Sequence, residues 1–122
     1  MTIHPIVHIE IPLSSPHENS AFYAQALGWK VESTPGFDYT QFVAEGGPGG
    51  GFVGTSQEGW LRYEVGKPLI YLGSTDIDAS LSAVTAYGGK IILNKTEIPN
   101  VGWFAVFSDP SGNQFAFFTS AR

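Results

Sequence analysis

Two ionisable side chains stand two residues apart in the run Val7-His8-Ile9-Glu10-Ile11. The run alternates apolar and polar residues, a pattern typical of a β-strand with one face on a hydrophobic core. Side chains so spaced lie on the same face of the strand, about 7 Å apart. A carboxylate near an imidazole favours the charged imidazole, so the two groups can act as a general acid–base pair. His8 and Glu10 are therefore the candidate catalytic residues.

The same two residues have other interpretations. They could converge on one metal ion, with His4 on the same face but four residues further back. A catalytic zinc or iron site ordinarily needs three protein ligands, however, and the absence of cysteine excludes thiolate ligands and thiol nucleophiles. A strand histidine can also pair with a carboxylate for stability alone, and this structural role stays open.

The composition limits the classes of function. The chain has 122 residues with a formal net charge of -5, so we expect one domain of residues 1–122 and no nucleic-acid partner. No apolar run is long enough to span a membrane, and no signal peptide is recognisable, which together favour a cytoplasmic protein. Fifteen glycines and eight prolines favour many turns and short strands. The 14% of aromatic residues predicts a large core, a ring-lined cavity, or both.

The elements that must position the candidate pair follow from the pattern of apolar residues. A helix is expected to begin at Ser15, which with Glu18 forms a capping box, and to end at Gly28. Phe22, Tyr23, Ala26 and Leu27 are expected on one face of this helix. Strands are expected at residues 29–33, 37–44 and 51–55. The stretch Gly49-x-Gly51-x-x-Gly54 matches a dinucleotide-binding pattern, but no helix is expected after it, so a flexible hairpin loop is the better interpretation.

The same order of elements then repeats. A strand at 68–73 and a helix at 76–87 precede strands at 90–93, 102–107 and 113–119, with a turn at Asp109-Pro110-Ser111-Gly112. The chain is therefore expected to contain two tandem βαβββ modules, at about 4–56 and 67–119, joined by a connector at 57–66 that carries Trp60. The predicted fold class is α+β.

The order of several short motifs resembles the vicinal oxygen chelate superfamily, which contains glyoxalase I, extradiol dioxygenases and bleomycin-resistance proteins. The motifs are His8-x-Glu10-Ile11-Pro12, Ala21-Phe22-Tyr23, Leu27-Gly28-Trp29, Thr75-Asp76-Ile77-Asp78-Ala79, Gly88-Gly89, Gly102-Trp103-Phe104-Ala105 and Asp109-Pro110-Ser111-Gly112-Asn113. The resemblance implies a curved eight-stranded mixed sheet around a cavity, with the helices on the outer face. Folds of this kind host several chemistries, so the function depends on the site.

The resemblance also implies where metal ligands would stand, at the first and last strands of each module. His8 occupies one such position. The strand from Pro68 to Tyr71 offers no His, Glu or Gln, Ala116 stands where the relatives have a glutamate, and Gly51 to Gly54 has no acidic residue. His8 is thus the one family-type ligand retained, and we expect no bound metal and no other cofactor.

The remaining candidate site residues are those expected to face the cavity as ligand-binding residues. Gln114 and Phe118 share the alternation of Ala116, whereas Phe115 and Phe117 should pack beneath the helices. Tyr71 and Trp103 are further candidates for aromatic walls, with ordinary core packing as the alternative.

Three functions remain open. The leading interpretation is a small-molecule-binding protein or metal-free enzyme. The second is a metal-dependent glyoxalase-like lyase, isomerase or dioxygenase that uses His8. The third is sequestration of a cationic drug, as the bleomycin-resistance relatives imply. A homodimer is expected, because closed two-fold pairing is the commonest oligomer, with the modules paired within one chain or swapped between two.

Overall fold

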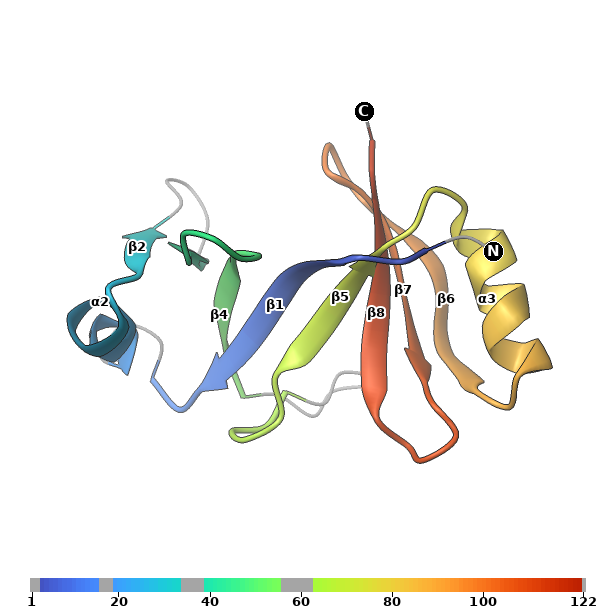
Figure 1. The fold of residues 1–122 in the computed structure, drawn as a ribbon, viewed down its shortest axis with the longest axis horizontal. Coiled ribbons are helices and arrows are strands. Elements are labelled where there is room, and N and C mark those ends of the chain that lie inside the picture. Colours follow the sequence, from blue (N-terminus) through green and yellow to red (C-terminus); the bar gives the residue numbers. More distant parts are fainter. Residues whose placement is uncertain (1–2, 16–18, 34–38, 56–62, 122) are drawn as a thin grey trace. The chain divides into compact units, whose positions relative to one another are not determined.

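A computed structural model describes residues 3–15, 19–33, 39–55 and 63–121. These residues contain eight strands and two helices (Figure 1). In chain order they are β1 (Ile6–Leu13), α2 (Ala21–Leu27), β2 (Lys30–Ser33), β3 (Thr40–Val43), β4 (Gly50–Gly54), β5 (Leu69–Gly73), α3 (Ile77–Ala86), β6 (Lys90–Ile98), β7 (Gly102–Ser108) and β8 (Gln114–Ser120). Strand, helix and three strands occur twice, which confirms the predicted α+β fold of two βαβββ modules.

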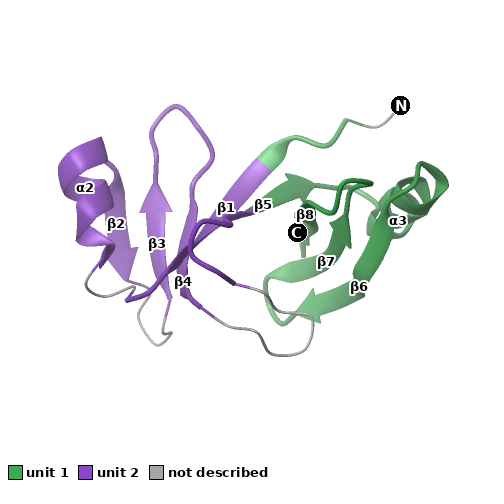
Figure 2. Ribbon diagram, turned by 90° about the horizontal axis from the view of Figure 1, so that it is seen from below, with its two compact units in different colours: residues 1–6, 70–122 green, residues 7–69 purple. Residues whose placement is uncertain are grey.

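The chain divides into two compact units, coloured separately in Figure 2. Unit 2 is residues 7–69, and unit 1 combines residues 1–6 with residues 70–122. The N-terminal segment therefore belongs to the unit built from the second half of the chain. Its attachment is a hydrogen bond from the Gly73 amide to the Pro5 carbonyl at 2.8 Å.

In unit 2 the strand order is β2-β3-β4-β1. The pairs β2–β3 and β3–β4 are antiparallel, whereas β4 and β1 are parallel. A parallel pair needs a crossover connection, and α2 lies between β1 and the other three strands in the chain.

The core of unit 2 is aromatic. Its buried residues are Leu13, Phe42 and Phe52, and Tyr23 of α2 packs against them. Trp29 stacks on Phe42 with ring centroids 4.5 Å apart. Phe22 and Leu27, which were expected on the same helix face as Tyr23 and hence in this core, do not fill it, since 59% of Phe22 and 51% of Leu27 are exposed. The helix has only seven residues, and Tyr23 supplies its ring contact with Phe52.

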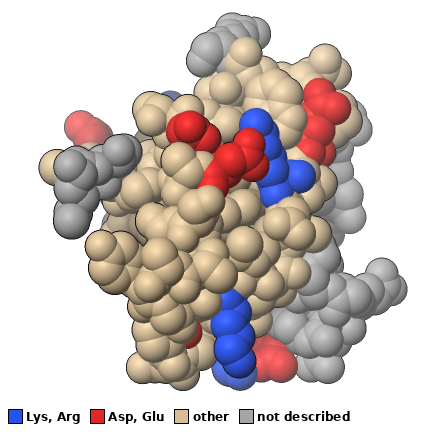
Figure 3. Space-filling view, turned by 90° about the vertical axis from the view of Figure 1, so that its right-hand side faces the viewer, with Lys and Arg blue, Asp and Glu red and all other residues tan. Residues whose placement is uncertain are grey.

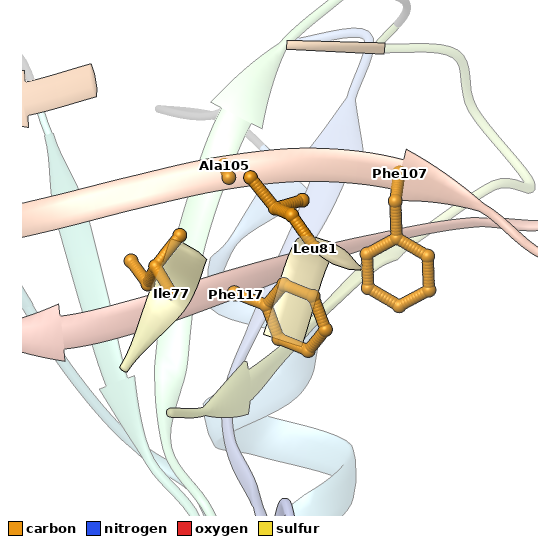
Figure 4. Packing of buried hydrophobic residues seen from close by; sticks show 5 residues of the cluster. All are labelled: Ile77, Leu81, Ala105, Phe107 and Phe117. Carbon is orange, nitrogen blue, oxygen red and sulfur yellow. The ribbon is translucent and has the colours of Figure 1, made fainter. Parts of the chain in front are cut away.

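Unit 1 repeats the arrangement with the strand order β5-β8-β7-β6, in which β5 and β8 are parallel. Its hydrophobic cluster brings α3 onto the strands (Figure 4). The buried members are Ile77, Leu81, Ala105, Phe107 and Phe117, and Phe115 packs against them. The prediction that Phe115 and Phe117 lie beneath the helix is confirmed.

The residues that begin and end the helices act in different ways. Gly28 ends α2 in the left-handed conformation, with φ of 72°, as the motif predicted. The side chain of Asp76 caps α3 by accepting a hydrogen bond from the Ala79 amide at 3.1 Å. In contrast, Ser20 precedes α2 without a side-chain cap.

Some element bounds differ from the expected ones. β6 continues to Ile98, five residues beyond the expected end, with irregular pairing to β7. The turn at residues 109–112 forms, with the Gly112 amide donating to the Asp109 carbonyl. The predicted capping residue Glu18, most of the connector 57–66 and Trp60 lie outside the described residues.

Charged side chains do not gather by sign on the face shown in Figure 3, where acidic and basic groups lie next to each other on a mostly uncharged surface. Within the described ranges, no helix has both the length and the apolar character needed to cross a membrane.

Candidate functional site

β1 separates its polar and apolar side chains as the alternation predicted. Ile9 and Ile11 pack against the hydrophobic cluster of unit 2. His8 and Glu10 therefore point to the opposite sheet face, and their side chains come together there, with His8 Nε2 3.6 Å from Glu10 Oε2. The predicted pairing of His8 with Glu10 exists in the structure.

Two tyrosines complete this group. The Tyr39 hydroxyl donates to Glu10 Oε2 at 3.1 Å, and the same hydroxyl lies 3.1 Å from His8 Nε2. The Tyr63 hydroxyl donates to the other carboxylate oxygen, Glu10 Oε1. We call His8, Glu10, Tyr39 and Tyr63 the unit 2 polar cluster. It joins an imidazole, a carboxylate and two phenols by hydrogen bonds within one unit.

The members of the cluster differ in access to solvent. The Glu10 side chain is 12% exposed and the His8 side chain 32% exposed. Burial, followed by the nearby Glu10 charge, raises the pKa of Tyr39 well above its usual value. Tyr39 is therefore a neutral hydroxyl over the ordinary pH range, and His8 is the more accessible of the two groups that Tyr39 joins.

A glycine leaves the room that Tyr39 occupies. Gly51 of β4 is the register partner of Glu10 on β1 and of Gln41 on β3. A Cβ atom added at Gly51 would lie 1.8 Å from the Tyr39 hydroxyl oxygen. Gly51 belongs to β4, which confirms the strand expected at residues 51–55, whereas the flexible-loop interpretation of Gly51 is wrong. Any larger residue there would displace the Tyr39 ring.

The other candidate residues belong to unit 1. Tyr71 pairs with Ala116, and Phe118 and Gln114 share the face of Ala116 by alternation along β8. Tyr71 is buried, Phe118 half-buried and Gln114 exposed. These three residues share one face as expected, and their contact with a ligand stays a prediction.

Trp103 does not share that face. It packs against the α3 cluster with Ala105 and Phe107, and Lys95 lies 5.5 Å from its ring centroid. Its neighbour Phe104 pairs with Phe118 and takes the position expected for Trp103. The expected register of β7 was wrong by one residue, which moves each side chain to the other face.

The donors present do not fit the metal centre that the resemblance implies. Tyr71 and Ala116 are paired on neighbouring strands, so a phenol and a methyl group stand in the unit 1 positions. Among residues 3–15, 19–33, 39–55 and 63–121, no group of three or more His, Asp or Glu side chains is arranged to hold a metal ion. His8 and Glu10 alone give two ligands, below the three that a catalytic zinc site uses.

A second histidine makes a separate network in unit 1. His4 Nε2 lies 2.7 Å from Ser80 Oγ on α3, and Ser80 Oγ lies 2.7 Å from Ser74 Oγ. The His4 ring also packs on Phe117 at 5.3 Å. Thus His4 fixes the N-terminal segment to α3 and does not belong to the polar cluster with His8.

Sequence reasoning did not identify Tyr39, Tyr63 or Gly51 as parts of the site. Tyr39 is two residues from Gln41, whose partner on the neighbouring strand is Gly51. This spacing beside a glycine was a signal by which the sequence could have assigned Tyr39 to the site. Tyr63 falls in the expected connector, where the sequence has no periodic pattern that assigns it to the site.

Comparison with known proteins agrees with the fold and its motifs. The model of the glyoxalase-like domain matches residues 8–118. A glyoxylase-like domain-containing protein of Didymella fabae is 30% identical over 128 residues, covering 98% of this chain and 97% of that protein. The putative glyoxylase CFP32 of Mycobacterium bovis is 43% identical over 47 residues, which cover 38% of this chain and 18% of its length. The latter match therefore spans less than a fifth of that relative.

Among solved structures, a glyoxalase/bleomycin resistance protein/dioxygenase superfamily member from Vibrio splendidus has a TM-score of 0.65, and the match covers 95% of this chain and 98% of that chain. Its sequence identity is 16%, so the likeness shows the shared fold. With a family model matching almost the whole length, this chain belongs to the glyoxalase-like domain family of the vicinal oxygen chelate superfamily.

Proposed function

We propose that this glyoxalase-like domain binds a small molecule and moves a proton on it, with His8 and Glu10 as the acid–base pair and no bound metal. The observation that carries the proposal is the Tyr39 bridge, whose hydroxyl lies 3.1 Å from both His8 Nε2 and Glu10 Oε2. A base held by a second group that is itself oriented by hydrogen bonds is the arrangement of an acid–base site.

The position of His8 supports its contact with the ligand. His8 is more exposed than Glu10, which accepts hydrogen bonds from two tyrosines. A buried carboxylate that is hydrogen-bonded in this way stabilises a positive charge on the imidazole without competing for the ligand. Imidazole exchanges protons near neutral pH, so a suitable ligand has a moderately acidic C–H, such as one next to a carbonyl group.

The residues at the implied metal-ligand positions disfavour the metal-dependent alternative. A metal bound at His8 Nε2 would have to replace the Tyr39 hydroxyl, which lies within hydrogen-bond distance of that nitrogen. The positions implied for the other ligands are held by Tyr71 and Ala116. The relatives named glyoxylase support small carbonyl compounds as the first ligands to test.

The test is hydrogen–deuterium exchange next to the carbonyl group. Pyruvate, hydroxyacetone and dihydroxyacetone are incubated in heavy water with the protein, and loss of the C–H signal is followed by proton NMR. We expect exchange of at least one compound with the wild type, and strong reduction in His8→Ala and Glu10→Gln. Addition of EDTA is expected to leave the rate unchanged.

The matched control is His4→Ala, which removes a histidine of unit 1 and should retain the exchange rate. Equal rates for the wild type and His8→Ala, or no exchange of any of the three compounds, would contradict proton transfer at His8. Loss of exchange in EDTA with recovery on adding zinc or manganese would contradict the metal-free mechanism.

A further inference from the structure

We propose that Tyr39 is a positioning residue that holds His8 protonated at Nε2, so that Nδ1 is the atom that takes the proton from the ligand. This inference rests on the proposed function and specifies which imidazole nitrogen reacts. It follows from counting hydrogens in the unit 2 polar cluster.

The Tyr39 hydroxyl has one hydrogen, and that hydrogen is donated to Glu10 Oε2. A carboxylate can only accept, so this direction is the one that an ionised Glu10 requires. The contact between Tyr39 and His8 Nε2 is 3.1 Å, and its hydrogen must then come from the histidine. His8 Nε2 donates to the Tyr39 oxygen, and in the neutral imidazole Nδ1 carries the lone pair.

One further contact and the raised pKa of Tyr39 keep the direction of this hydrogen bond from reversing. The Tyr63 hydroxyl donates to Glu10 Oε1, so each carboxylate oxygen accepts a hydrogen bond from a phenol. Burial and the Glu10 charge raise the pKa of Tyr39, which keeps its hydroxyl hydrogen in place. Glu10 therefore orients Tyr39, and Tyr39 orients the imidazole.

Gly51 makes this arrangement possible because it has no side chain. All three of the nearest atoms to an added Cβ there belong to the Tyr39 ring or hydroxyl, at 1.8 to 2.7 Å. At neighbouring Gly50 the nearest atom is instead the Ile9 carbonyl oxygen, at 1.7 Å. An alanine at residue 51 is thus expected to move Tyr39, whereas one at residue 50 would strain the β1–β4 pairing.

The proton step balances within these groups. The ligand C–H bond breaks, its electron pair stays on the ligand as an enolate, and the proton forms a bond to His8 Nδ1. The resulting imidazolium is stabilised by the Glu10 carboxylate through the Tyr39 hydroxyl. Return of the proton from Nδ1 to carbon restores the neutral imidazole, and no oxidant or co-reactant is needed.

The test reads the histidine tautomer directly and needs no ligand. Long-range proton–nitrogen correlation spectra of the labelled protein are recorded above about pH 8, where an ordinary histidine is neutral. For wild-type His8 we expect a protonated, pyrrole-type Nε2 and an unprotonated, pyridine-type Nδ1. Tyr39→Phe should lower the fraction of the Nε2–H tautomer, because it removes the oxygen that lies 3.1 Å from Nε2.

Two control variants separate this effect on the tautomer from a general loss of folded structure. Tyr23→Phe alters a tyrosine of the hydrophobic cluster and should leave the His8 signals unchanged. Gly51→Ala should reproduce the Tyr39→Phe spectrum, whereas Gly54→Ala, where nothing lies within 4 Å of an added Cβ, should not.

A pyridine-type Nε2 in the wild type, or an unaltered Nε2–H form in both Tyr39→Phe and Gly51→Ala, would overturn the inference. If the tautomer is as expected but His8→Ala exchanges carbonyl compounds as fast as the wild type, the positioning role stands and the proposed function fails.

Discussion

In unit 2 the sheet face opposite the hydrophobic cluster carries Glu10 and His8, whereas in unit 1 the corresponding face carries Tyr71, Ala116 and Val106. Both units use the same strand order and pack a helix on the other face. The difference shows that the βαβββ frame does not determine the chemistry of its open face. A glycine in the right register leaves room for the half-buried Tyr39 beside Glu10 in unit 2, whereas the unit 1 face has no carboxylate among Tyr71, Ala116 and Val106.

His4 and His8 show the same contrast between the units. In unit 1, the Asp76 amide donates to Ser74 Oγ, and the two serine hydroxyls and His4 Nε2 continue the chain of hydrogen bonds. That network connects the N-terminal segment to a helix. In unit 2 the histidine is connected through Tyr39 to a carboxylate. We therefore expect substitutions in unit 1 to change mainly stability and those in the polar cluster to change mainly chemistry.

The largest expected effect is in the core of unit 1. Phe117→Ala removes a ring that is 3% exposed and in contact with Phe107, so it should lower the free energy of unfolding by about 3–5 kcal/mol. Phe22→Ala in α2 removes an exposed ring and should change it by less than about 0.5 kcal/mol. Urea unfolding followed by circular dichroism measures both. Equal losses would contradict the described burial of the two rings.

A smaller effect is expected where the helices begin. Asp76→Ala removes the cap of α3 and should lower the free energy of unfolding by about 1 kcal/mol. Ser20→Ala is the matched variant for α2, where no side-chain cap exists, and should cost less. The same urea measurement compares them, and a greater loss for Ser20→Ala would show that the capping difference between the units is wrong.

The smallest effect concerns the pH dependence of unit 2. Because the pKa of Tyr39 is raised in the folded protein, its stabilisation is complete below the unfolded tyrosine pKa of about 10 and is lost as pH rises above that value. Wild type should therefore lose more stability than Tyr39→Phe between neutral and strongly alkaline pH. Parallel stability curves for the two proteins would contradict a raised Tyr39 pKa.

Most of the fold was predictable from local signals. Gly28, the turn at residues 109–112 and the alternation in β1 each depend on neighbours in sequence. The end of β6 was not predictable in this way, because Asn94 to Glu97 is polar and joins the strand through its pairing with β7. The exposure of Phe22 and Leu27 depends on how much of a seven-residue helix reaches the sheet, which a helical pattern alone does not define.

The candidate site was predictable only in part. Alternation along one strand placed His8 beside Glu10, since that needs no information beyond five residues. Tyr39 and Tyr63 lie 29 and 53 residues from Glu10 and reach it through tertiary structure. Trp103 was assigned to the wrong face because two adjacent aromatic residues, Trp103 and Phe104, make the register of β7 ambiguous.

The membership of residues 1–6 in unit 1 has a consequence for the order in which the protein is made. Unit 2 is one continuous stretch, 7–69, so all of its residues have been synthesised once translation reaches residue 69. Unit 1 combines residues 1–6 with residues 70–122, and Pro5 and His4 make hydrogen bonds to Gly73 and Ser80 across that gap in sequence. During translation His4 and Pro5 are therefore synthesised well before their partners, and the residues of unit 2 are complete before those of unit 1.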